Sequence, residues 1–292
     1  MEQLDKIILG DNQFFGINHR SQEKAEEMLK HFNNIDNIFE VNNNAFDCGI
    51  KAVMLNSNEK AIAICDQFRD NKSRYGEIAL YPSVPYAYKY ANMVNEMGIF
   101  PAINETIFKG NSAKGVLGMM AKGVTVAVTK DAMKMMEMLI DVEYKMFRDL
   151  NVRVFFLQNI VTDLILGYNI KEVFEHFCEY VRKKYKVTPG FVTLNMPYLK
   201  KKLEEWGIEN VVICSSINAA GFNMHPSKEE YEKVISNNDS SKYQLMAMNV
   251  LASGSISVKE SFDYINSLNI QSVVFGASSK NHIQSTVDAI KI

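Results

Sequence analysis

The sequence predicts an α/β fold in which eight parallel strands alternate with helices to form a (β/α)8 TIM barrel. The chain has 292 residues, a length typical of such barrels. Short apolar segments rich in Val, Ile and Phe do not alternate with polar residues, as expected for strands that are buried on both faces. Amphipathic segments with helix-capping signals lie between them. We predict one domain over residues 1–292.

The predicted strands are the apolar segments that recur along the chain. They lie at residues 6–10, 37–41, 77–81, 152–158, 190–195, 210–217, 243–250 and 272–277. The interval between the third and fourth strands is about 70 residues, roughly twice the usual repeat. We therefore predict a helical insertion at about 99–130, with an additional strand in this interval as the alternative.

Helix starts are marked by a serine followed three residues later by a glutamate. Ser227 with Glu230 and Ser257 with Glu260 match this capping box, in which the two side chains satisfy free backbone N–H groups. Gly207, which follows LKKKLEEW, marks a helix end.

Composition argues against several classes of function. A net charge of −2 leaves no basic excess for binding a nucleic acid. No apolar stretch approaches the ~20 residues that cross a membrane, and the first residues lack a signal peptide. The four cysteines lack zinc-site spacing. We predict a cytoplasmic protein that binds a small molecule without a metal, and a homo-oligomer is compatible with the sequence.

The residues that follow the predicted strands are the candidates for chemistry, because barrel active sites lie at the carboxyl ends of the strands. Glu40 lies at the end of the second predicted strand, Asp47 lies beyond it, and either could act as acid or base. A buried ion pair for Glu40 and a helix cap for Asp47 are the alternatives. Gln158, at the end of the fourth predicted strand, is the third catalytic candidate.

Uncharged polar residues also gather at these positions. A carboxamide donates and accepts hydrogen bonds without a charge, which suits a sugar or the carboxamide of a nicotinamide. Asparagine also favours turns, which is the alternative explanation. The predicted substrate-binding residues are Asn12, Asn42, Tyr81, Asn195 and Asn218.

The eighth predicted strand runs into the sequence GASSK, residues 276–280. A glycine lets the backbone approach a ligand, and a serine can cap a helix whose N-terminus attracts an anion. Barrels commonly bind phosphate here. A plain helix cap is the alternative. The predicted cofactor-binding residues are Gly276, Ser278, Ser279, Lys280 and, at the end of the seventh predicted strand, Asn249.

Four segments in the C-terminal half resemble strands five to eight of the aldo-keto reductases with the loops that follow them. They are GFVTLN, VVICSSIN, LMAMNVLASG and VVFGASS. GASSK looks like the phosphate-binding turn of that family, and LGDNQFFG near the N-terminus resembles its opening. The resemblance covers about half the chain. It implies a (β/α)8 barrel with NADP or NAD as cofactor.

The catalytic tetrad of that family, Asp, Tyr, Lys and His, does not carry over. Its aspartate would fall on Glu40 and its tyrosine on Ala45. Its lysine would fall on Tyr81 or Pro82, and its histidine on Gln158. In the family the tyrosine, activated by the lysine, donates the proton to the carbonyl oxygen. The resemblance therefore implies altered or absent reductase chemistry.

Three functions are compatible with the sequence. The first is an aldo-keto-reductase-like barrel that binds a nucleotide cofactor or a phosphorylated metabolite. The second is a nicotinamide-independent lyase, isomerase or sugar-processing enzyme that uses Glu40 and Asp47. The third is a non-catalytic barrel that senses a ligand.

Overall fold

The strands of the computed structural model, which describes residues 1–16, 22–85 and 130–292, form a closed parallel barrel. β4 and β5 are two parts of one barrel strand, because both pair with β3. β1 pairs with β2 on one side and β9 on the other, which closes an eight-stranded barrel and confirms the predicted fold class. The strands are β1 Ile7–Gly10, β2 Ala52–Asn56, β3 Ala79–Val84, β4 Asn151–Val152, β5 Val154–Leu157, β6 Thr188–Thr193, β7 Val211–Ser216, β8 Tyr243–Met248 and β9 Ser272–Phe275.

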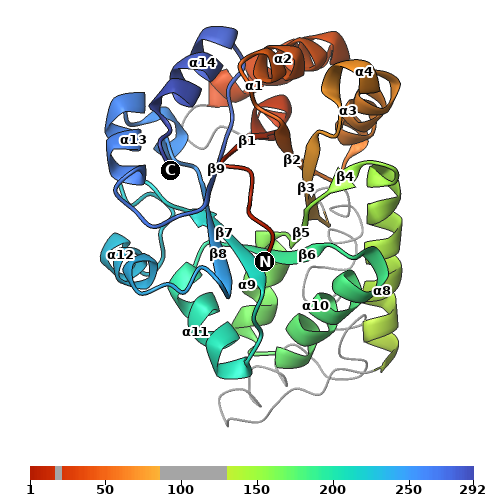
Figure 1. The fold of residues 1–292 in the computed structure, drawn as a ribbon, viewed down its shortest axis with the longest axis vertical. Helices are drawn as coiled ribbons and strands as arrows, with labels where there is room; N and C mark the ends of the chain where they lie inside the picture. The colour runs from red at the N-terminus through yellow and green to blue at the C-terminus, as the bar shows by residue number, and fades with distance from the viewer. Residues whose placement is uncertain (17–21, 86–129) are drawn as a thin grey trace.

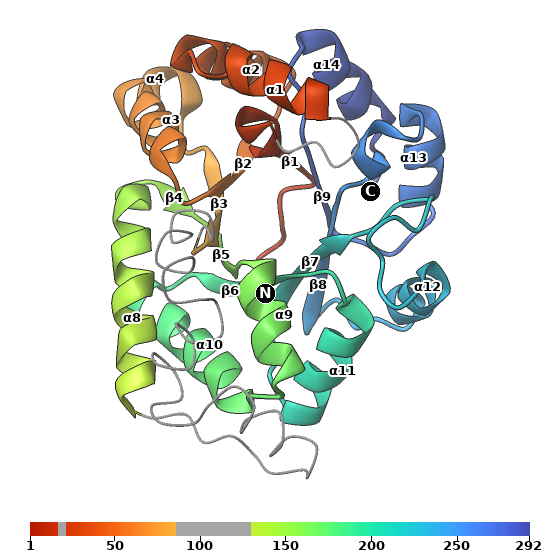
Figure 2. The ribbon, with the colours of Figure 1, turned by 180° about the vertical axis from the view of Figure 1, so that it is seen from behind.

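Helices surround the strands as an outer ring (Figure 1), and the reverse view shows the same arrangement (Figure 2). They are α1 Gln22–His31, α2 Ile35–Asp47, α3 Glu59–Asp70, α4 Lys72–Tyr75, α8 Lys130–Tyr144, α9 Asn159–Gly167, α10 Lys171–Tyr185, α11 Met196–Trp206, α12 Lys228–Ser236, α13 Val258–Ile265 and α14 Lys280–Ala289. Short 3-10 turns are η1 Asn12–Phe15, η3 Lys145–Phe147 and η4 Ala252–Gly254. The predicted insertion at about 99–130 lies, except for Lys130, outside the described residues.

The capping signals in the sequence act at the helix ends where they were predicted. The Ser227 and Ser257 hydroxyls accept hydrogen bonds from the backbone N–H groups of Glu230 and Glu260 and begin α12 and α13. Gly207 ends α11 with a φ of 69°, a left-handed conformation that glycine adopts without strain.

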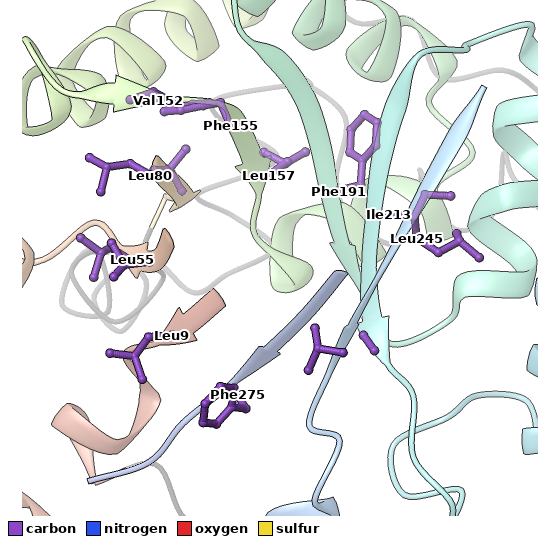
Figure 3. Packing of buried hydrophobic residues seen from close by; sticks show 14 of the residues in the cluster. Leu9, Leu55, Leu80, Val152, Phe155, Leu157, Phe191, Ile213, Leu245 and Phe275 are labelled. Atoms are coloured by element: carbon purple, nitrogen blue, oxygen red, sulfur yellow. The ribbon is translucent and has the colours of Figure 1, made fainter. Parts of the chain in front are cut away.

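Successive side chains of each strand alternate between the barrel interior and the layer beneath the helices. Ile8, Met54 and Phe156 belong to the interior cluster. Leu9, Leu55 and their counterparts on the other strands belong to a second cluster, which packs against the helices (Figure 3). Most strand positions are therefore covered on both faces, which explains why the strand sequences are mainly apolar.

The interior is filled where Phe156 of β5 packs over Gly190 of β6. A Cβ added at Gly190 would lie 2.4 Å from the Phe156 ring, so glycine is the residue that leaves room for it. Both residues are buried. The barrel centre at this level is thus a packed core rather than a channel.

Polar contacts close the amino-terminal end of the barrel. The Tyr81 hydroxyl, from inside β3, donates to the Asp5 carboxylate at 2.6 Å. Arg153, which separates β4 from β5, donates to the same carboxylate at 3.2 Å and also pairs with Glu2. Burial and the Asp5 carboxylate raise the pKa of Tyr81 above its usual value. These contacts tie the chain before β1 across the floor of the barrel.

The predicted second strand, residues 37–41, is wrong: these residues lie within α2. Ile38, Val41 and Ala45 are buried at the three- and four-residue spacing of a helix, and the Asn34 side chain caps its start. The true second strand is β2, whose sequence AVMLN follows the loop after α2.

Gly190→Ala is expected to lower the free energy of unfolding by about 1–3 kcal/mol, because the new methyl group would overlap the Phe156 ring. Urea unfolding measures the change. Gly167→Ala is the matched control, since a Cβ there meets no atom within 4 Å. An unchanged urea concentration at the unfolding midpoint of Gly190→Ala would contradict tight packing between Phe156 and Gly190.

Candidate functional site

The carboxyl ends of the strands bring polar side chains together at one mouth of the barrel. The last inward-facing position of β2 is Asn56, which lies opposite Ser83 of β3 in the strand register. Gln158 directly follows β5, and its backbone N–H donates to the carbonyl of Val84 at 2.8 Å. These residues share the inward parity of Met54, Tyr81 and Phe156, so they form the layer above the apolar interior.

A hydrogen-bond network links the ends of β1, β2 and β5. Asp11, the residue after β1, accepts from the Asn56 backbone N–H and from Asn56 Nδ2, each at 2.7 Å. Asn56 Oδ1 in turn accepts from Gln158 Nε2 at 3.0 Å. This arrangement fixes which way each side-chain amide is turned. The Asn56 NH2 group points to the Asp11 carboxylate, and the Asn56 oxygen points to the Gln158 NH2 group. The network therefore fixes three side chains across the mouth.

The Asp11 carboxyl is an acid in an environment that disfavours its charge. It is 3% exposed. Burial raises its pKa to about 7, although the hydrogen bonds from Asn56 act in the opposite direction. Among the described residues no lysine, arginine or histidine forms an ion pair with it. At neutral pH this group can therefore exchange a proton, as a general acid or base must.

The turn between β9 and α14 forms a second part of the mouth. Gly276, Ser278, Ser279 and Lys280 are all exposed. The Ser279 side chain accepts from the His282 backbone N–H and caps the ten-residue α14. Lys280 is the first residue of this helix, so a positively charged residue lies at the end of the helix that carries free N–H groups and the positive end of the dipole.

Gln13 lies beneath this turn. Its Nε2 donates to the carbonyls of Gly10 at 2.8 Å and Ala277 at 3.4 Å, so it bridges the ends of β1 and β9. Its Oε1 is buried and has no hydrogen-bond partner within the described part of the chain. A Cβ at Gly276 would lie 2.5 Å from that oxygen, so glycine permits the close approach.

The three predicted asparagines of the C-terminal half take part in local turns. The Asn195 side chain accepts from the Tyr198 backbone N–H and caps α11. Asn218 exchanges two 2.8 Å hydrogen bonds with the backbone of Phe222, and Asn249 Oδ1 accepts from the Ser253 backbone N–H. All three lie just beyond the carboxyl ends of their strands, as the sequence predicts.

Asp163 of α9 braces the loop after β6. Its carboxylate accepts from the Thr193 hydroxyl at 2.5 Å and from the Leu194 backbone N–H at 3.0 Å. Burial raises its pKa, and the two hydrogen bonds and His225 act in the opposite direction. These hydrogen bonds fix the Asp163 carboxylate near the mouth and stabilise the loop after β6.

Four predicted site residues are not positioned as expected. Glu40 is exposed on α2, and Asp47 pairs with Arg74 at 2.6 Å beyond the amino-terminal end of β2. Asn42 is buried against α3, where it donates to Gln67 at 3.1 Å. Tyr81 does not end its strand, because β3 continues to Val84, and its hydroxyl contacts Asp5 at the amino-terminal end of the barrel.

Two other predicted residues lie at strand ends. Asn12 begins η1 directly after Asp11 and is exposed, and Gln158 lies at its predicted strand end.

The residues missing from the predicted set are Asp11, Gln13 and Asn56. Asp11 and Gln13 follow a correctly predicted strand, so their positions after KIILG were a usable signal. Predicting Asn56 as a site residue would have required recognising β2 in the sequence. No local pattern in the sequence shows that Asp11 and Asn56 pair, since that contact arises from the β1–β2 register, in which Gly10 lies opposite Met54.

Comparison with solved structures shows that the chain has the barrel fold of the aldo-keto reductases. A putative aldo-keto reductase from Pseudomonas aeruginosa is similar at a TM-score of 0.59 and 11% identity, over 99% of this chain and 91% of that one. An aldo/keto reductase from Brucella melitensis gives 0.54 and 9%, over 100% and 91%. The aldose reductase from Schistosoma japonicum gives 0.53 and 11%, over 100% and 88%. No family model and no curated protein matches the sequence.

Three further properties concern the described residues alone. Within residues 1–16, 22–85 and 130–292, no three His, Cys, Asp or Glu side chains are grouped so as to hold a metal ion. In the same ranges no helix is long and apolar enough to cross a membrane. All four cysteines are buried and none forms a disulfide.

The raised pKa of Asp11 predicts how stability varies with pH. Above its ordinary value of 3.8 the unfolded carboxyl has lost its proton, whereas the folded one keeps it up to about 7. The folded state then binds more protons, so its stability falls across this window, by up to about 4 kcal/mol, and levels off above pH 7.

Urea unfolding of the wild type and of Asp11→Asn between pH 4 and 8 measures this loss. Asp11→Asn should show a smaller loss than the wild type. Asp263→Asn, at an exposed carboxylate that pairs with Lys259 on α13, should leave the pH dependence unchanged. Equal pH dependence in the wild type and Asp11→Asn would contradict the raised pKa.

Proposed function

We propose that this chain binds a nucleotide cofactor, NADP or NAD first among them, or a phosphorylated metabolite, at the carboxyl ends of its strands. We propose further that its reductase chemistry is altered. The observation that carries the binding proposal is the β9–α14 turn, where an exposed helix N-terminus, Lys280 and a close-packed Gly276 lie together. The shared barrel fold supports the same reading.

The residues present fit such a ligand. The first-turn N–H groups of α14 would hold a phosphate, Ser278 or Ser279 could donate to it, and Lys280 would add a positive charge. Gln13 Oε1, which is buried without a partner among the described residues, offers an acceptor for an N–H or O–H group of the ligand. A reduced nicotinamide, when bound, would supply a hydride to a carbonyl carbon.

Altered chemistry is proposed because of the residues at three strand ends. The resemblance to aldo-keto reductases places the aspartate, lysine and histidine of the tetrad at the ends of strands two, three and four. The structure has Asn56, Ser83 and Gln158 at the ends of β2, β3 and β5. An amide and a hydroxyl cannot carry the charge of a lysine or titrate as a histidine does. Any proton transfer would then use another group.

The lyase, isomerase or sugar-processing hypothesis depended on Glu40 and Asp47 at the mouth, and both lie on α2 instead. A ligand-sensing barrel without catalysis would bind the same ligand at the same turn, so this hypothesis differs from the proposed function only in the absence of turnover.

The single domain, the cytoplasmic location and a homo-oligomer stay predictions from the sequence.

Titration calorimetry with NADPH and with NADH tests the binding proposal. Wild type should bind at least one of them, and Lys280→Ala should weaken binding by roughly 3- to 10-fold, because one charge near a phosphate is lost. The difference between the two proteins should shrink at high salt.

Lys259→Ala is the matched control, because this exposed lysine lies on α13 and pairs with Asp263. It should bind as the wild type does. The absence of heat with both nucleotides would contradict the cofactor half of the proposal. Equal affinities in Lys280→Ala and the wild type would contradict the assignment of the phosphate to this turn.

A further inference from the structure

The Asp11 carboxyl is a buried acid at the mouth that the proposed cofactor site leaves unused. We propose that Asp11 donates the proton to the oxygen of a substrate carbonyl, and that Asn56 and Gln158 are the residues that position it. This inference rests on the proposed function, because it completes a reduction for which that function supplies the hydride.

The geometry leaves Asp11 able to carry and release one proton. Asn56 donates to both carboxyl oxygens, one bond each, and so occupies two of the roughly four lone-pair positions of the carboxylate. A proton can occupy one of the remaining positions, and the O–H group that it forms can donate to a substrate oxygen. The two bonds from Asn56 also stabilise the carboxylate once the proton has left, which a proton donor requires.

The position of the network suits a substrate above the apolar interior. Asn56 and Gln158 come from β2 and β5, which flank β3, so the network spans the mouth over the end of that strand. Below it the barrel is filled by Phe156 and Tyr81. A substrate carbonyl bound above these side chains would lie at the level of the Asp11 carboxyl.

Within the ranges that the structure describes, no charged group on the neighbouring elements forms an ion pair with Asp11. On α3, Glu59 is exposed and the Lys60 ammonium donates to the carbonyl of Phe14. On α14, Lys280 is exposed. β2 ends in the uncharged Asn56, and the uncharged Gln158 follows β5. Among the described residues, burial therefore dominates the acidity of Asp11, and its pKa of about 7 suits a proton donor at neutral pH.

The step balances in atoms and electrons. A bound reduced nicotinamide would supply a hydride, with its electron pair, to the carbonyl carbon as the C=O π bond breaks, and would itself become oxidised. The carbonyl oxygen takes the proton from the Asp11 carboxyl and becomes a hydroxyl. The Asp11 carboxylate then regains a proton from water. The net reaction is a two-electron reduction of an aldehyde or ketone to an alcohol.

Steady-state kinetics test this role, with NADPH or NADH and a panel of aliphatic and aromatic aldehydes and ketones between pH 5 and 9. In the wild type, kcat/KM should fall tenfold per pH unit above about pH 7, where Asp11 has lost its proton. Asp11→Asn should lower kcat/KM by about 10²- to 10⁴-fold and abolish this pH dependence. Asp263→Asn, on the outer surface of α13, should match the wild type.

Asn56→Ala tests positioning and serves if Asp11→Asn does not fold. It removes one of the two hydrogen bonds that favour the carboxylate, so the fall in kcat/KM should begin at a higher pH. Carbon-13 NMR of aspartate-labelled protein gives a readout without turnover. A carboxyl signal that is missing in Asp11→Asn should titrate near pH 7 in the wild type and at a higher pH in Asn56→Ala.

The outcomes separate this inference from the binding proposal. If neither nucleotide binds the wild type, both fall. If a nucleotide binds and carbonyls are reduced, but Asp11→Asn keeps the wild-type rate and pH profile, the Asp11 role alone is overturned. If a nucleotide binds and no carbonyl is reduced at any pH, the proton-donor role is likewise overturned while the binding proposal stands.

Discussion

The parallel pairing of β1 with both β2 and β9 is the constraint on which the rest of the structure depends. It joins the first strand to the last and turns an open sheet into a barrel. The same pairing places Asp11 next to Asn56 on one side and Gln13 next to Ala277 on the other. Residues separated by more than 260 positions in the chain thus meet at one mouth.

Side chains alternate along each strand between the barrel interior and the helices, and this alternation decides which residues can reach the mouth of the barrel. The interior cluster around Ile8, Met54 and Phe156 is apolar, and the positions above it are polar at Asn56, Ser83 and Gln158. Buried polar groups are costly unless they are hydrogen-bonded, and most of these amides satisfy one another. Two groups at the carboxyl ends of strands differ from these amides: the Asp11 carboxyl is hydrogen-bonded but has a raised pKa, and Gln13 Oε1 has no hydrogen-bond partner among the described residues.

The fold was largely predictable from the sequence because buried parallel strands leave a local signature. VVICSSI and VVFGA are short, β-branched and bounded by turns, and they form β7 and β9. NIFEV was misassigned because a short apolar run does not distinguish a strand from one face of a helix. The spacing of Ile38, Val41 and Ala45 carries that information over a longer window.

The candidate site was less predictable because it depends on register. GASSK and Gln158 could be placed from the strands that precede them. Asp11 could be placed too, but its burial and its two bonds from Asn56 follow from the alignment of β1 against β2. That alignment is set by barrel closure, which is a property of all the strands together.

The packing of Phe156 over Gly190 limits how a ligand can be recognised. The ring fills the centre of the barrel just beneath the polar layer, so the ligand that we propose would lie across the strand ends rather than along the barrel axis. Loops that follow the strands would then contact its outline, while the polar layer would contact its functional groups. Substrate range and chemistry would thereby depend on different parts of the chain, and evolution could change the first without disturbing the second.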